Sequence, residues 1–166
     1  MDEVWIGAHD GDRHELRELF ALAEDSPAQL DSYLAEGRIL VARRGSDIIG
    51  HLQLVNTDLA GALEIKNMAV REGDQGQGIG AQLIQAALEL AAAGSATTML
   101  VATAAADTGN LRFYQRQGFR MRSIDRDAFT PATGYPDQIV IDGIQLRDRV
   151  WLDRAVRTGD RAETRQ

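Results

Sequence analysis

The chain has 166 residues, a formal net charge of -7 and no cysteine, which excludes disulfides, thiolate metal sites and a cysteine nucleophile. This acidic balance disfavours nucleic-acid binding and suits a cationic partner. Because there is no apolar run of about 20 residues, no basic signal segment and no metal-ligand spacing among His9, His14 and His51, we expect a metal-free cytoplasmic protein that does not enter membranes.

The first part of the chain predicts one strand, two helices and a hairpin of strands. A short apolar strand at residues 4–6 is followed by a helix that opens at Asp12 and repeats apolar residues at helical spacing. A second helix begins at Ser26-Pro27, because proline suits the first helical position. Two strands, at residues 38–43 and 47–56, are close enough in sequence to form a hairpin.

The rest of the chain alternates strands with helices. The expected elements are a strand at 62–70, a helix at 79–93, a strand at 98–102, a helix at 110–117, a strand at 119–127, and a hairpin at Asp142-Gly143 with strands on both sides within 139–152. This order predicts one α/β domain over residues 1–155, followed by a polar, frayed tail at 156–166. The irregular segment at 130–136 is a candidate substrate-binding loop.

Three glycines at alternate positions, Gly76, Gly78 and Gly80, stand just before the long predicted helix. Glycines allow backbone N–H groups to approach a ligand, and a helix N-terminus attracts anions, so this segment suits a phosphate. A turn with a helix cap and no ligand is the alternative. A dinucleotide loop also fits the glycines, but polar residues 71–75 separate them from the strand and residues 96–106 contain no acid. A P-loop is excluded, because no Gly-Lys-Ser/Thr follows.

Three segments together resemble the GCN5-related N-acetyltransferase (GNAT) superfamily. Gln75-x-x-Gly78-x-Gly80 resembles its acyl-CoA pyrophosphate loop, and Asn67-Met68-Ala69-Val70 is similar to the strand before that loop. The third segment, Phe113-Tyr114-Gln115-Arg116-Gln117-Gly118-Phe119, resembles the F-Y-x-x-x-G-F signature. The resemblance spans residues 4–127 and implies a mixed, mainly antiparallel, twisted sheet of about six or seven strands flanked by about four helices.

This resemblance implies an N-acetyltransferase that uses acetyl-CoA and transfers acetyl directly to a primary amine. A non-catalytic acyl-CoA sensor and a dinucleotide oxidoreductase are the alternatives. The implied cofactor-binding residues are Met68, Ala69, Val70, Gln75, Gly76, Gln77, Gly78, Ile79, Gly80, Ala81 and Asn110. Asn110 departs from the family pattern, in which the corresponding asparagine lies further from the tyrosine.

Two catalytic residues are implied, Glu64 and Tyr114. Glu64 would act as the base through water; it could instead be a solvated carboxylate paired with Lys66, and His51 is a second candidate base. Tyr114 would protonate the CoA thiolate, since a phenol of pKa about 10 matches a thiol of pKa about 8.5. Alternatively, Tyr114 packs in the core with its hydroxyl bonded to the backbone. Strand alternation predicts one face shared by Glu64, Lys66, Met68 and Val70, unless a bulge resets the alternation.

The residues around the 130–136 segment suggest an acceptor site. Acidic side chains there would suit a cationic amine, and the candidate substrate-binding residues are Asp127, Tyr135 and Asp137. The alternative for each aspartate is an ordinary turn or surface residue. The strands after residue 139 could join the sheet of a second copy, which would give a homodimer.

Overall fold

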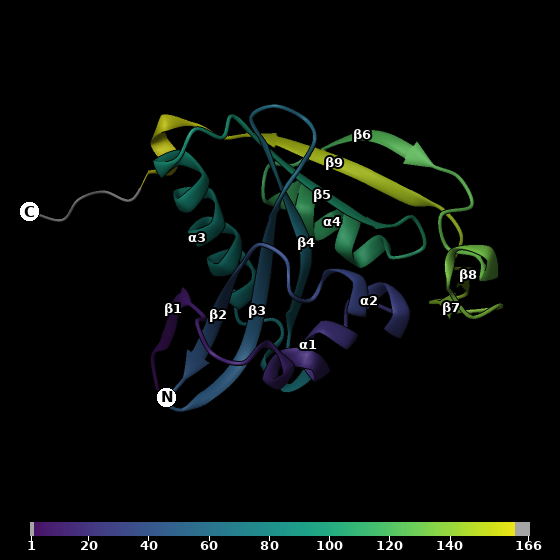
Figure 1. Cartoon of the computed structure of the whole chain (residues 1–166), viewed down its shortest axis with the longest axis horizontal. Helices are drawn as coiled ribbons and strands as arrows, with labels where there is room; N and C mark the ends of the chain where they lie inside the picture. The colour runs from purple at the N-terminus through teal and green to yellow at the C-terminus, as the bar shows by residue number, and fades with distance from the viewer. Residues whose placement is uncertain (1, 162–166) are drawn as a thin grey trace, which may run out of the picture.

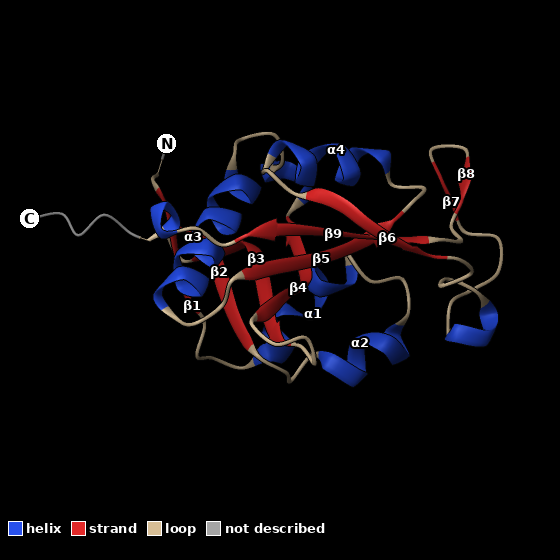
Figure 2. Cartoon of the chain, turned by 90° about the horizontal axis from the view of Figure 1, so that it is seen from above, coloured by secondary structure: helices blue, strands red, loops and turns tan. Residues whose placement is uncertain are grey.

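The computed structural model describes residues 2–161, which contain a seven-stranded mixed sheet (Figures 1 and 2). The strand order is β1-β2-β3-β4-β5-β9-β6, and all neighbours are antiparallel except β4 and β5. The strands are β1 (Val4–Ala8), β2 (Arg38–Arg44), β3 (Asp47–Asn56), β4 (Ala62–Val70), β5 (Thr98–Ala104), β6 (Arg120–Asp125) and β9 (Arg149–Ala155). The predicted mixed, mainly antiparallel sheet is confirmed.

Helices cover both faces of the sheet, with α1 and α2 on one face and α3 and α4 on the other (Figure 2). Within residues 2–161 the α-helices are α1 (Arg17–Ala21), α2 (Pro27–Tyr33), α3 (Ile79–Ala93) and α4 (Thr108–Arg116). As the sequence predicts, α2 begins at Ser26-Pro27, where the Ser26 hydroxyl accepts a hydrogen bond from the Gln29 amide (3.2 Å). No helix in this part of the chain is long and apolar enough to cross a membrane.

Each face of the sheet has its own hydrophobic core. The larger core buries the apolar stripe of α3, including Leu83 and Leu88, against Leu52 and Leu152 of the sheet. The smaller core packs Phe20 of α1 and Leu30 of α2 against the other face. Burial of a side chain of this size contributes about 1.5–3 kcal/mol, so these contacts fix both helical layers on the sheet.

A β-bulge in β4 changes which side chains share a face. Gln53 pairs with Asn67 and Leu54 pairs with Ile65, so Lys66 is the extra residue. Leu63 and Ile65 therefore lie in the larger core together with Met68 and Val70. The predicted face shared by Glu64, Lys66, Met68 and Val70 is wrong, because the bulge shifts the alternation by one residue. Lys66 lies instead over the ring of Tyr33 in α2.

The predicted hairpin at Asp142-Gly143 forms, but it is small and stands outside the main sheet (Figure 1). Its strands are β7 (Val140–Ile141) and β8 (Ile144–Gln145), and both turn residues have positive φ, 47° and 82°. The longer strand expected up to residue 152 is β9, which lies between β5 and β6. Both edges of β9 are already paired within the chain, whereas β7 and β8 pair only with each other, and a homodimer through the strands after residue 139 stays a prediction.

The first residues of the predicted tail contact the rest of the domain. Residues 158–160 form a 3₁₀ turn in which the Asp160 carboxylate accepts hydrogen bonds from the Arg157 amide (2.7 Å) and from Arg154 Nη2 (3.0 Å). Val156 packs on the larger core. The frayed tail expected at residues 156–166 stays a prediction, and residues 162–166 lie outside the described part.

Candidate active site

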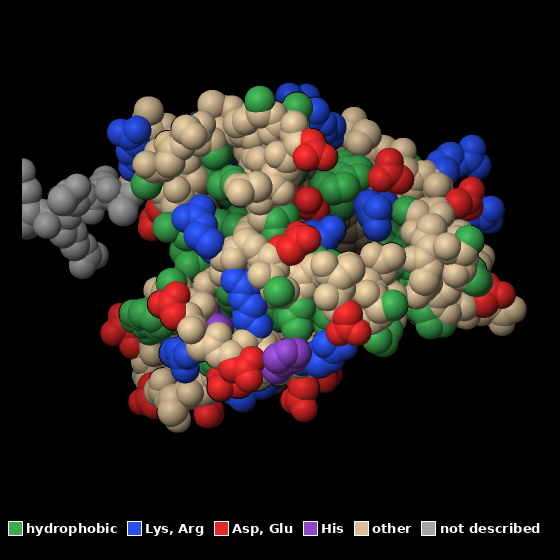
Figure 3. Space-filling view, viewed as in Figure 1, with side chains coloured by type: hydrophobic (Ala, Val, Ile, Leu, Met, Phe, Trp, Pro, Cys, Tyr) green, Lys and Arg blue, Asp and Glu red, His purple; other side chains and the backbone are tan. Residues whose placement is uncertain are grey.

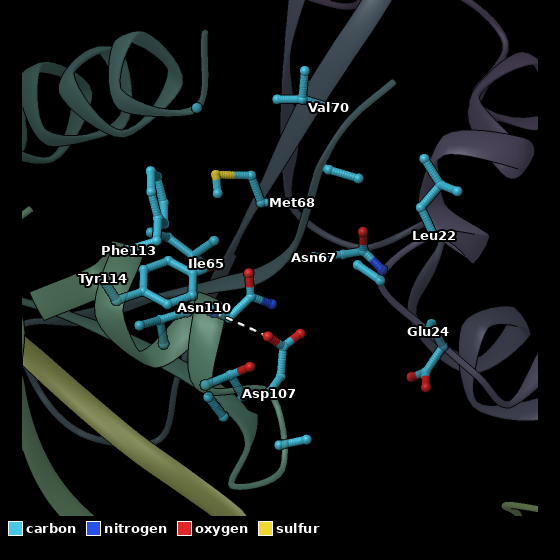
Figure 4. Close-up of a pocket in the computed structure, with 18 of the residues that line it drawn as sticks. Leu22, Glu24, Ile65, Asn67, Met68, Val70, Asp107, Asn110, Phe113 and Tyr114 are labelled. Carbon is cyan, nitrogen blue, oxygen red and sulfur yellow. Dashed lines mark hydrogen bonds between the residues drawn. The ribbon is translucent and has the colours of Figure 1, made fainter. Parts of the chain in front are cut away.

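A cavity of about 1000 Å³ lies where β4 and β5 separate (Figure 4). The two parallel strands are paired only from Ala62 and Thr98 to Ile65 and Val101. Beyond these pairs, the second half of β4 and the end of β5 line the cavity with their backbones unpaired to each other. The remaining walls come from the loop before α3, the start of α4, the α1–α2 loop and parts of the chain between residues 129 and 151.

The glycine loop forms one end of this cavity. Gly76 and Gly78 have φ values of 76° and 80°, a left-handed conformation that glycine adopts without strain. Gly78 is also the N-cap of α3, so the first N–H groups of that helix are free to bind an anion. A Cβ atom on Gly80 would lie 3.1 Å from the ring of Phe113, so this glycine allows α3 and α4 to approach closely.

Side chains hold the glycine loop against the sheet. The buried carboxylate of Asp74 accepts hydrogen bonds from Arg44 and from Arg71 Nε, the latter at 2.7 Å. Arg44 also donates to Gln77 Oε1 (2.8 Å), and Gln75 Nε2 donates to the carbonyl of Val70 (3.0 Å). Gln77 thus points to Arg44, and among the predicted cofactor-binding residues it is the exception that does not line the cavity.

Met68 and Asn110 face each other across the cavity in Figure 4. Met68 and Val70 lie on the unpaired half of β4. Asn110 lies in the first turn of α4, where its backbone N–H donates to the capping carboxylate of Asp107 (2.9 Å) and its side chain points into the cavity. Asn110 precedes Tyr114 by one helical turn, so both residues present their side chains to the same cavity.

Tyr114 projects from α4 between two other rings. Its ring makes edge contacts with Phe113 and Phe119, at centroid distances of 5.2 and 5.7 Å. The side chain is only 5% exposed, and burial together with the nearby Asp107 raises the pKa of the phenol. Within residues 2–161 no protein group hydrogen-bonds to its hydroxyl, which therefore does not cap the backbone. A protonated phenol at the cavity wall can donate a proton there.

Glu64 lies on β4 and lines the same cavity. Its side chain is 14% exposed and its carboxylate is 3.9 Å from Lys66 Nζ. Burial raises the pKa of Glu64, while the positive charges of Lys66 and Arg149 oppose that rise. The carboxylate is thus paired with Lys66 at long distance. It also faces the cavity, and its raised pKa makes it a stronger base than an ordinary glutamate.

His51, the second candidate base, lies outside the cavity. Its ring is fully buried, is stacked on Phe20 (4.1 Å between centroids) and shares a 2.8 Å hydrogen bond between Nε2 and Asn67 Oδ1. The Asn67 amide nitrogen donates to the Tyr33 hydroxyl and to the Phe20 carbonyl, so Nε2 of His51 must be the donor. Burial lowers the pKa of His51 to about 4. The histidine is therefore a neutral structural residue of the core.

The three predicted acceptor residues do not lie together. Tyr135 lines the cavity, and its hydroxyl donates to Glu24 (2.8 Å). Asp127 is instead bound to Arg147 (2.6 Å), and Asp137 is exposed and accepts from the amide of Gln138. Neither aspartate lines the cavity, because the segment after β6 turns their side chains to the outside.

Comparisons with known proteins agree with this geometry. The family model of the acetyltransferase (GNAT) domain matches residues 35–121. Over 155 residues the chain is 35% identical to YvbK, an uncharacterized N-acetyltransferase of Bacillus subtilis, and the match covers 92% of this chain and 98% of that protein. The chain belongs to the GNAT acetyltransferase family. This confirms the resemblance seen in the sequence, and the protein is an N-acetyltransferase.

Solved structures of other GNAT proteins superpose closely on this one. An IAA acetyltransferase of Bacillus cereus is 33% identical, with a TM-score of 0.83 over 92% of this chain and 99% of that chain. A Bacillus subtilis acetyltransferase in complex with CoA is 34% identical, with the same TM-score and coverage. A GNAT acetyltransferase of Elizabethkingia anophelis with acetyl-CoA bound is 32% identical, with a TM-score of 0.84 over 93% of this chain and 99% of that chain.

The cavity of this GNAT acetyltransferase also contains residues that the sequence analysis missed. They are Glu24 in the α1–α2 loop, Phe129 in the segment after β6, and Arg149 and Trp151 of β9. No local motif marks them, because they come from three separate parts of the chain and meet only in the folded protein. The one available signal was the position of Glu24 directly before the predicted helix at Ser26-Pro27, in a connection that can reach a ligand.

Proposed function

We propose that this acetyltransferase binds acetyl-CoA in the cavity between β4 and β5 and transfers the acetyl group directly to a primary amine. The observation that carries the proposal is the convergence, on one cavity, of an anion-binding glycine loop, a carboxylate of raised pKa and a protonated phenol. The chemistry requires a bound acyl donor, a base for the amine and an acid for the departing thiolate.

The donor would be bound at two places. The free N–H groups at the start of α3 take the pyrophosphate, since Gly76 and Gly78 leave the backbone open to a ligand. The pantetheine arm lies along β4, where the half that carries Met68 and Val70 has no partner on the β5 side and can accept an added strand. The relatives from Bacillus subtilis and Elizabethkingia anophelis, with CoA and acetyl-CoA bound, support this choice of donor.

The transfer itself needs no covalent enzyme intermediate. Glu64 removes a proton from the ammonium form of the acceptor, directly or through water, and the neutral nitrogen attacks the thioester carbonyl carbon. The nitrogen of the tetrahedral intermediate is positively charged and loses its second proton as the intermediate collapses. The carbon–sulfur bond breaks, the thiolate takes a proton from Tyr114, and the proton lost by the nitrogen restores the phenol through solvent. The products are an acetamide and free CoA.

Thiol release gives a direct test of this proposal. The chain has no cysteine, so a thiol reagent detects only CoA and has no background from the protein. We expect acetyl-CoA to release thiol in the presence of a primary amine, and the acetylated amine to appear in equal amount by mass spectrometry. Binding of acetyl-CoA without release by any of a broad panel of amines would contradict the proposal and favour an acyl-CoA sensor.

A further inference from the structure

The carboxylate of Glu24 is held in the cavity wall by two tyrosines. The Tyr33 hydroxyl of α2 donates to Oε1 (3.1 Å), and the Tyr135 hydroxyl donates to Oε2 (2.8 Å). Burial raises the pKa of both phenols, so both stay protonated and act as donors. Tyr33 is itself fixed from behind by Asn67, whose amide donates to its hydroxyl (3.0 Å). One of the two tyrosines that orient this carboxylate, Tyr135, is 111 residues from Glu24 in the chain.

No cation neutralises this carboxylate within residues 2–161. None of the salt bridges there includes Glu24. Two cations of the cavity have other carboxylates nearby, since Lys66 lies 3.9 Å from Glu64 and Arg149 lies 3.9 Å from Asp125. The tyrosine hydroxyls are neutral donors. Oε2 also accepts a long hydrogen bond from the Ser26 amide (3.4 Å), whereas Oε1 has Tyr33 as its partner and keeps a lone pair for another hydrogen bond. Glu24 is thus a fixed negative charge with room for a cationic ligand.

The position of Glu24 indicates which cation it would bind. Figure 4 places Glu24 across the cavity from Tyr114 and Met68, where the thioester would react. The attacking nitrogen must be neutral at that point, and in the proposed mechanism Glu64 takes its proton. Glu24 already accepts hydrogen bonds from two tyrosines, and an ion pair with it favours a protonated ammonium. A cation held by Glu24 is therefore a different nitrogen from the one that is acetylated.

We infer that Glu24, positioned by Tyr33 and Tyr135, binds a second ammonium group of the acceptor, so that the acceptor class is diamines and polyamines. This inference rests on the proposed function and specifies its substrate. Charge-assisted hydrogen bonds from an ammonium to a half-buried carboxylate favour such acceptors over amines of the same length with an uncharged end. Tyr135 acts as a positioning residue: it orients Glu24, so the segment after β6 affects which acceptor binds.

The test compares matched pairs of acceptors. Straight-chain α,ω-diaminoalkanes and monoaminoalkanes of equal length present the same reactive amine, so the ratio of their kcat/KM values isolates the second cation. We expect the diamine to be favoured about tenfold or more at the best length. Glu24→Gln should reduce this ratio to about twofold, the statistical factor for two equivalent amines, and Tyr135→Phe should reduce it in part. Glu18→Gln, an exposed carboxylate of α1 outside the cavity, should leave the ratio unchanged.

Equal use of diamines and monoamines by the native enzyme, or an unchanged ratio in Glu24→Gln, would overturn the inference. Acetyl-CoA binding by each variant, measured by calorimetry, verifies that it is folded. If no amine is turned over, the proposed function fails, and titration of the CoA-bound protein with a diaminoalkane still tests Glu24. Loss of diamine binding in Glu24→Gln would then support the ammonium site, and undiminished binding would overturn it.

Discussion

At the scale of single residues, the proposed proton donor is Tyr114. Tyr114→Phe removes only the hydroxyl, which has no protein partner within residues 2–161, and keeps the edge contacts of the ring with Phe113 and Phe119. We expect kcat to fall about 100-fold, because a general acid contributes at least that much, while acetyl-CoA affinity stays nearly constant. Steady-state kinetics with calorimetry measures both quantities, and unchanged turnover would remove the tyrosine from the mechanism.

The proposed role of Glu64 as the base predicts how kcat/KM depends on pH. A base acts only when ionised, so kcat/KM should rise with pH through a pKa above the ordinary value for glutamate, since burial raises it. Lys66 opposes this rise, and Lys66→Met should therefore move the acidic limb of the profile to higher pH. Glu64→Gln should abolish that limb and lower turnover about 100-fold. An acidic limb that persists in Glu64→Gln would assign the base to another group.

His51 links the buried polar network to stability rather than to catalysis. Its folded-state pKa of about 4 lies below the ordinary value of 6.5, so between these values the unfolded chain binds a proton that the folded protein does not. Protonation of His51 in the unfolded chain therefore does not affect the free energy of unfolding above about pH 6.5. It lowers the free energy of unfolding by about 3 kcal/mol as the pH drops to about 4.

The matched variant for this effect is His51→Gln, which keeps an N–H donor for Asn67 but does not titrate. Urea unfolding at about pH 4.5 and about pH 7 should show a smaller loss of stability in the variant than in the native protein. Other groups whose pKa changes on folding are common to both proteins, so the comparison isolates the histidine. Equal losses would show that His51 keeps an ordinary pKa in the folded state.

At the scale of elements, the glycine loop is the feature whose geometry matters most for binding. Gly78→Ala places a side chain at φ 80°, which costs about 1–2 kcal/mol in a left-handed conformation and shifts the N–H groups at the start of α3. We expect acetyl-CoA affinity to weaken about tenfold by calorimetry. Gly73→Ala is the matched control, because its Cβ atom would meet nothing within 4 Å and it needs no positive φ. Equal effects of the two variants would argue against pyrophosphate binding at this loop.

Periodicity and turn chemistry predict the elements well where local rules act alone. The strands and the helix around the glycine loop, the Ser26 cap and the Asp142-Gly143 turn all appear in the structure close to their predicted places. The sequence does not predict features that depend on which strands pair in the folded sheet. The bulge at Lys66 depends on the register between β3 and β4, and the position of β9 depends on two partner strands distant in sequence.

The sequence predicts part of the cavity wall. Motifs marked Tyr114 and the glycines, because these residues are close together in the chain. The acceptor side has no such motif, and the proposed anchor there, Glu24, meets Tyr135 only because the segment after β6 folds back on the α1–α2 loop. The aspartates chosen by composition, Asp127 and Asp137, lie outside the cavity.

At the scale of the whole molecule, one opening in the sheet organises the site. The short pairing of β4 with β5 leaves a cavity flanked by both helical layers. Acidic and basic side chains are mixed over the face seen in Figure 3, where no continuous basic patch is visible. The edge strands of the main sheet are β1 and β6, so a homodimer, which stays a prediction, would not form through β9.

The most direct test of the account is calorimetric titration of the native protein with acetyl-CoA, CoA and NADH in parallel. The cavity, the glycine loop and the open half of β4 predict saturable binding of both CoA species to a single site, and no binding of NADH. Binding of NADH alone would contradict the account, because it would mean that the glycines hold a dinucleotide.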